Sequence, residues 1–114
     1  MSMAAIWSFS YVAGDAVILD FAVTDDAGAV VDLTNYTIAF AARRTPSSIA
    51  VIASPATATI TKTDAVNGKF RVTVTSAVTA SLRDTFGWQA EISAAGVVQT
   101  VASGYITFTD SLVP

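Results

Sequence analysis

The chain has 114 residues, a net charge of −3 and neither Cys nor His; 53% of its residues are hydrophobic and 13% are charged. This length fits one domain, residues 1–114, and the apolar share excludes intrinsic disorder, which requires low hydrophobicity and high net charge. Without Cys and His, disulfides, His-dependent triads and thiolate zinc sites are excluded, so we predict a protein that is not an enzyme and has no cofactor.

Short segments along the chain alternate between apolar and polar side chains with a period of two, which is typical of half-buried β-strands. They are rich in Val, Ile, Thr and aromatic residues, the residue types that favour strands. In chain order, these segments occupy residues 6–11, 16–23, 36–41, 57–61, 69–75, 88–93, 97–101 and 105–109. Each is expected to present one face to a core, because successive strand side chains point in opposite directions.

Turn residues separate these segments. The predicted turns lie at residues 25–28, 67–68, 94–96 and 103–104, with loops around Pro46 and Pro55. The pair Asn67-Gly68 is a strong hairpin signal. Residues 76–82 interrupt the alternation, and Val78 and Leu82 are four residues apart, which predicts one helical turn over the end of the strands.

This pattern predicts an all-β fold. Roughly eight or nine short strands separated by turns favour an immunoglobulin-like antiparallel β-sandwich with one short helical turn. The Cys…Trp…Cys hallmark of true immunoglobulin domains is absent, so the label describes architecture only. A small β-barrel is the alternative, because a sequence does not reveal whether the sheet edges close.

The apolar runs are too short for a membrane helix, which needs about 20 consecutive apolar residues. Runs such as 16–19, 39–42 and 49–53 are each followed by a charged or hydroxyl residue. The N-terminus also lacks the basic region of a signal peptide. We therefore predict no membrane partner and synthesis in the cytoplasm.

Arg43 and Arg44 are adjacent at the end of a predicted strand, where they are suited to a phosphate or a partner's carboxylate. The remaining basic residues are dispersed, so no basic stripe exists and nucleic acid is not a predicted partner. Because Arg is enriched at protein interfaces, we predict that this pair lies at one.

The acidic residues offer weaker candidates. Asp25 and Asp26, with Asp20 and Asp32 nearby, have oxygens that a calcium ion could use, but Asp in a hairpin turn needs no metal to explain it. Glu91 is the only Glu, and no second acid is placed to complete a glycosidase pair. We therefore predict no metal site and no catalytic residue.

The aromatic residues favour a core, with one group that also suits an interface. Trp7, Phe9 and Tyr11 share one face of the first segment, where they either cap the core or, on an edge strand, contact a neighbouring protein. Ile18 belongs to an outward phase that is unusually apolar for solvent, together with Ala16, Ala22, Ala39 and Ala41. Trp7, Phe9, Tyr11, Ile18, Arg43 and Arg44 are the predicted interface residues.

Several motifs occur in a fixed order along the chain. Gly14-Asp15 precedes a strand, and residues 25–36 read DDAGAVVDLTNY. Residues 64–68 and 75–82 form a D-x-x-x-G and a T-x-x-x-T-x-x-L motif, and Gly104, Ile106 and Phe108 close the chain. In order and spacing, residues 6–110 resemble the N-terminal domain of phage baseplate upper proteins and related small tail and virion proteins. Asn35 stands where that family usually has Gly, a mild change because Asn tolerates positive φ.

This resemblance implies a phage virion structural protein, located in the virion, that acts as a tail or baseplate adaptor. Its expected partners are other virion proteins and further copies of itself in a homo-oligomer. The family domain usually precedes receptor-binding or coiled-coil segments, so the resemblance covers a docking module and not those segments. A capsid decoration (cement) protein is the alternative, and a carbohydrate- or receptor-binding module is a further one.

Overall fold

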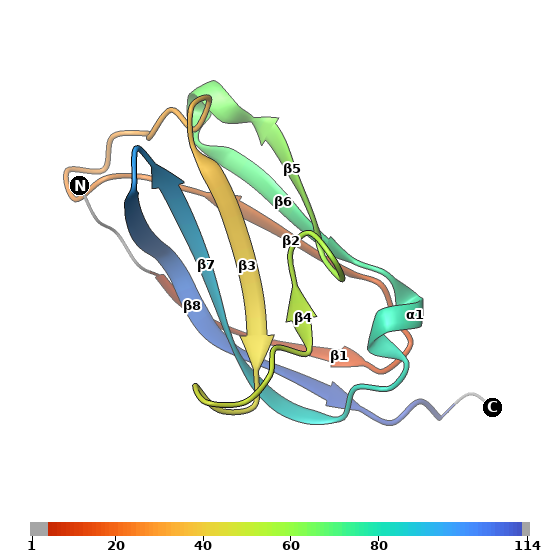
Figure 1. Ribbon diagram of the computed structural model, residues 1–114. Coiled ribbons are helices and arrows are strands. Elements are labelled where there is room, and N and C mark those ends of the chain that lie inside the picture. The colour runs from red at the N-terminus through yellow and green to blue at the C-terminus, as the bar shows by residue number, and fades with distance from the viewer. Residues whose placement is uncertain (1–4, 113–114) are drawn as a thin grey trace.

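The computed structural model describes residues 5–112, with side chains from residue 8 onward, and its strands form two sheets (Figure 1). The five-stranded sheet contains, in spatial order, β1 (Ala5–Val12), β8 (Val97–Thr109), β7 (Asp84–Ala94), β3 (Thr37–Arg43) and β4 (Ile52–Ala53). The three-stranded sheet contains β2 (Val17–Ala22), β6 (Lys69–Val74) and β5 (Thr59–Asp64). This arrangement confirms the predicted all-β sandwich.

The strand order is that of an immunoglobulin-like sandwich. Strands β8, β7, β3 and β4 correspond to G, F, C and C′, and β2, β6 and β5 correspond to B, E and D. Within the described residues, the sheets remain separate and each keeps two free edges, so the barrel alternative is not formed. One pair departs from the predicted antiparallel pattern, because β1 runs parallel to β8.

Two short helical elements connect the strands. A 3₁₀ turn, η1 (Ala65–Asn67), joins β5 to β6, and α1 (Ser76–Thr79) lies at one end of the sandwich between β6 and β7 (Figure 1). The position of α1 confirms the predicted helical turn. Among the described residues, no helix has the length and apolar character needed to cross a membrane.

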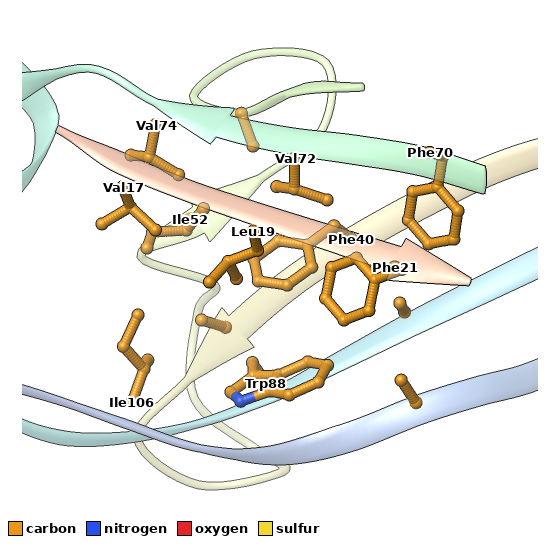
Figure 2. Packing of buried hydrophobic residues seen from close by; sticks show 14 of the residues in the cluster. Val17, Leu19, Phe21, Phe40, Ile52, Phe70, Val72, Val74, Trp88 and Ile106 are labelled. Atoms are coloured by element: carbon orange, nitrogen blue, oxygen red, sulfur yellow. The ribbon is translucent and has the colours of Figure 1, made fainter. Parts of the chain in front are cut away.

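The core lies between the two sheets and follows the predicted alternation. In β2, buried and exposed residues alternate without exception, so that Val17, Leu19 and Phe21 point inward. Of these, Phe21 packs against the indole of Trp88 on β7, whose ring centroid lies 5.6 Å from that of Phe21 and 5.7 Å from that of Phe40 on β3 (Figure 2). Each such aromatic pair stabilises the fold by about 0.5–1.5 kcal/mol beyond the burial of area.

The turn predictions had mixed outcomes. The turn at residues 94–96 is confirmed, with Ala95 and Gly96 at φ of 53° and 81°, the left-handed values of a two-residue hairpin loop. The turn at residues 103–104 is wrong, because β8 continues through Ser103 and Gly104 to Thr109. Gly104 pairs with Trp88 across the ladder, where the lack of a side chain leaves room beside a large indole.

Candidate interaction surface

The outer face of the five-stranded sheet has an open groove of about 900 Å³. Its walls come from β3, β7 and β8 and from the segment that follows β3. Outward-facing residues on the three strands include Ala39, Ala41, Gly87, Gln89, Ser103 and Tyr105. Most of these side chains are small, because the bulky residues of the same strands, such as Phe40 and Trp88, point into the core. The sheet is therefore accessible close to its backbone on this face.

The groove has a cationic end where β3 finishes. Nη1 of Arg43 donates a hydrogen bond of 2.8 Å to the carbonyl oxygen of Ser48, and this contact positions the guanidinium at the groove wall. Arg44 lies 3.7 Å from a carboxylate oxygen of Asp84, and its guanidinium carbon is 4.7 Å from the centre of the Phe86 ring. Arg44 thus has an anionic neighbour within the chain, whereas Arg43 has no ion-pair partner among the described residues.

The opposite end of the groove is anionic. Glu91 on β7 accepts a hydrogen bond of 3.0 Å from the side-chain amide of Gln89, and Gln89 also donates one of 2.8 Å to the hydroxyl of Thr100. Like Arg43, Glu91 forms no ion pair in the described part of the chain. Besides Arg44, which is paired with Asp84, one unpaired cation and one unpaired anion therefore line the same groove without neutralising each other.

The predicted interface residues do not form one surface. Arg43 and Arg44 both line the groove, whereas Ile18, with 52% of its side chain exposed, lies on the outer face of the other sheet. Phe9 and Tyr11 are half-buried against the core, with ring centroids 5.8 Å from Trp88 and 6.4 Å from Phe108 respectively. The side chain of Trp7 lies outside the described residues. Core packing thus accounts for the two described aromatics of β1.

Three groove residues were not recognised in the sequence as interface candidates. Tyr105 is 59% exposed on β8, Gly87 lies opposite it on β7, and Glu91 was expected to be an ordinary solvated strand residue. The alternation contained a signal for Tyr105, since Gly104 and Ile106 on either side of it belong to the inward phase. Nothing in the sequence placed it beside Arg43, because that neighbourhood depends on the sheet order.

Two of the acidic candidates, Asp25 and Asp20, have partners within the chain. Oδ1 of Asp25 accepts hydrogen bonds from the backbone amides of Ala27 and Ala29, which explains the acidic turn through its local geometry. Asp20 forms a two-point pair with Arg71, at 2.7 and 3.2 Å, which lowers the pKa of the carboxyl. Over the described residues, no group of three or more potential metal-ligating side chains is found.

The geometry can be compared with that of known proteins. The chain is similar to a solved structure described as Tim-1, with a TM-score of 0.52 and 14% sequence identity over 96% of this chain and 97% of the other. At this identity, the likeness shows a common fold and nothing more. No protein-family model and no curated protein matches the chain. The resemblance to phage virion domains therefore stays a prediction.

Proposed function

We propose that the protein is a non-enzymatic structural component of a phage virion, an adaptor in the tail or baseplate that assembles by protein–protein contacts. The observation that supports this proposal most is the outer face of the five-stranded sheet, with its groove of small residues and its unpaired charges. A face of this kind suits contact with another protein surface. The virion location itself rests on the order and spacing of the sequence motifs.

Further apolar side chains outside the groove also support an assembling part. Exposed large hydrophobic residues occur on both sheets and on loops: Ile18, Val30, Ile49, Val97 and Val98, each with more than half of its side chain accessible. Removing such apolar surface from water is favourable by about 25 cal/mol per Å², before the costs of association are subtracted. Only 13% of the residues are charged, against about 25% in ordinary domains. The surface therefore has fewer charged side chains than usual to keep it in water, which favours contact with neighbouring subunits.

The test begins with phage particles purified from the source of this sequence. Mass spectrometry should find the protein in the particles, and immunogold labelling should place it at the tail or baseplate. Label spread over the capsid shell would favour a decoration protein instead. The proposal is overturned if the protein is absent from the particles while it is present in the lysate.

Glycan arrays separate the proposal from the carbohydrate-binding alternative. We expect no glycan to bind the purified protein. Binding that disappears in Tyr105→Ala, at an unchanged melting temperature, would contradict a purely structural role, since Tyr105 presents an exposed ring in the groove and aromatic side chains commonly line ligand sites.

A further inference from the structure

We propose that the groove is the contact surface between two copies of this chain, which pack their five-stranded sheets face to face across a two-fold axis so that each Arg43 meets Glu91 of the other copy. This inference names a partner for the assembling part proposed above and rests on that proposal. Three features of the groove support it: Gly87, a glycine that the fold does not require; the positions of the charges of Arg43 and Glu91; and the exposed ring of Tyr105.

Gly87 is the first feature. It has no positive φ, and a Cβ added to it would find its nearest atom, the carbonyl oxygen of Arg43, at 3.8 Å, an ordinary van der Waals distance. The isolated domain therefore tolerates a side chain at this position. Glycine inside a strand weakens it and often marks a place where another backbone or ligand approaches closely. At Gly87, that approach comes from outside the sheet, because the residue faces the groove.

The order of the charges is the second feature. Arg43 pairs with Gly87 across β3 and β7, and Glu91 pairs with Ala39. The two charged residues are thus four positions apart along adjacent strands, roughly 13 Å at about 3.3 Å per residue. They lie at opposite ends of the groove, and neither has an ion-pair partner in the described part of the chain.

A second copy of the chain, turned end for end, places a negative charge opposite Arg43 and a positive charge opposite Glu91, so no other protein is needed to pair them. A two-fold axis that lies in the contact plane and crosses the strands near Ala41 and Gln89 reverses the groove end for end. The row of Arg43, Gly87 and Tyr105 then faces the row of Ala39, Glu91 and Thr100 of the second copy. Such an interface is isologous, because the same patch serves both subunits, and two-fold dimers are the commonest symmetric assemblies.

The geometry of the facing rows is sterically consistent. In the row at the axis, Ala41 and Ser103 flank Gln89 and are small, so the sheets are free to approach the spacing of about 10 Å that is usual between packed sheets. Gly87 leaves space for the carboxylate of the second copy. The ring of Tyr105, 59% exposed in the isolated chain, becomes covered by the row that contains Thr100. Tyr and Arg are the residue types that dominate the energetics of protein interfaces.

Sedimentation velocity of the purified full chain over a range of concentrations tests the pairing. We expect a concentration-dependent dimer whose Kd rises on the order of tenfold in Arg43→Glu and in Glu91→Arg, because each change places like charges opposite each other. The double variant Arg43→Glu/Glu91→Arg should return close to the wild-type Kd. Lys69→Glu and Asp26→Arg, exposed charge reversals of the same size outside the groove, should leave it unchanged.

A steric variant keeps the test independent of the charges. Gly87→Leu adds a Cβ that meets only ordinary van der Waals contacts in the isolated domain, and the rest of the side chain points out of the sheet into the groove. We therefore expect a monomer that melts no lower than the wild type when both are measured at a concentration below the dimer Kd. Gly87→Ser, which adds a shorter side chain at the same point, should weaken the dimer less than Gly87→Leu does. The inference is overturned if the wild type stays monomeric at about 1 mM, or if it forms a dimer that tolerates Gly87→Leu and both single charge reversals.

The outcome is separable from that of the proposed function. A monomeric protein that is nevertheless found in phage particles overturns the pairing and leaves the virion role intact. A dimer that responds to the groove variants but is absent from the particles supports the pairing and overturns the virion role.

Discussion

The hydroxyl of Thr79 links two parts of the chain that are distant in sequence. Thr79 is the one polar residue that is fully buried in the described part of the chain. Its Oγ1 accepts a hydrogen bond of 3.1 Å from the amide of Gly14 and donates one of 2.7 Å to the carbonyl of Asp15. The turn between β1 and β2 is thereby fixed to α1, which gives a structural reason for two of the sequence motifs, Gly14-Asp15 and the Thr at position 79.

We expect Thr79→Val to lower the free energy of unfolding by about 1–3 kcal/mol. The substitution keeps the shape of the side chain but leaves the Gly14 amide and the Asp15 carbonyl without this partner. Urea denaturation measures the change, and Thr79→Ser, which retains the hydroxyl, serves as the control. A Val variant that is at least as stable as the Ser variant would contradict this account of the turn.

The pair of Asp20 and Arg71 sets the local response to acid. Its hydrogen bonds lower the pKa of the Asp20 carboxyl below the ordinary value of 3.8, so the pair favours the folded state above that pH. This contribution is lost as the pH falls through the lowered pKa. The carboxyl resonance of Asp20, followed by NMR, should titrate below the ordinary value and move back toward it in Arg71→Gln. An unchanged titration in the variant would show that Arg71 is not the cause.

At the scale of strands and turns, the sequence predicted which side chains of a strand point inward better than it predicted which strands pair with one another. The alternation identified the inward residues of β2, β6 and β7, because each of these strands buries one face only. It gave no information on which strands pair, since pairing depends on contacts between distant segments. The parallel approach of β1 to β8 was not predicted for this reason. The passage of β8 through Ser103-Gly104 was missed because Gly marks either a turn or a close approach within a strand.

Gly68 is a case in which the turn itself requires glycine. Its φ is +75°, and a Cβ would lie 2.6 Å from the carbonyl oxygen of Val23 and 2.8 Å from that of Val31, both of them backbone atoms. Gly28 has a similar φ of +84° but nothing within 4 Å of an added Cβ. We expect Gly28→Ala to cost about 1 kcal/mol, the price of the left-handed backbone alone, and Gly68→Ala to cost at least ~2 kcal/mol.

Thermal or urea unfolding of the two variants makes this comparison directly. The prediction concerns the difference between them, since both glycines have a positive φ and only one is crowded by backbone. Equal losses of stability would mean that the backbone around Gly68 adjusts freely and that the β5–β6 connection is not held against Val23 and Val31.

For the whole molecule, the sandwich creates the candidate surface by bringing distant segments together. Arg43 was predicted as an interface residue from its position after a strand. Gly87 and Tyr105 come close to it only because β7 lies beside β3 and β8 lies beside β7. Phe9 and Tyr11 were candidates on the condition that their segment is an edge strand. The structure places β1 at an edge, but both side chains pack against the core. The sequence thus shows that a given side chain points outward from its strand. It does not show which other outward side chains will lie beside it on the sheet.

The most direct measurement is an electron cryo-microscopy map of the phage particle that contains this protein. The account predicts density for the sandwich in the tail or baseplate, with the groove of each copy covered by the groove of a second copy and Arg43 next to Glu91 across the contact. Particles without this density, or copies whose five-stranded sheets all face solvent, would contradict the account.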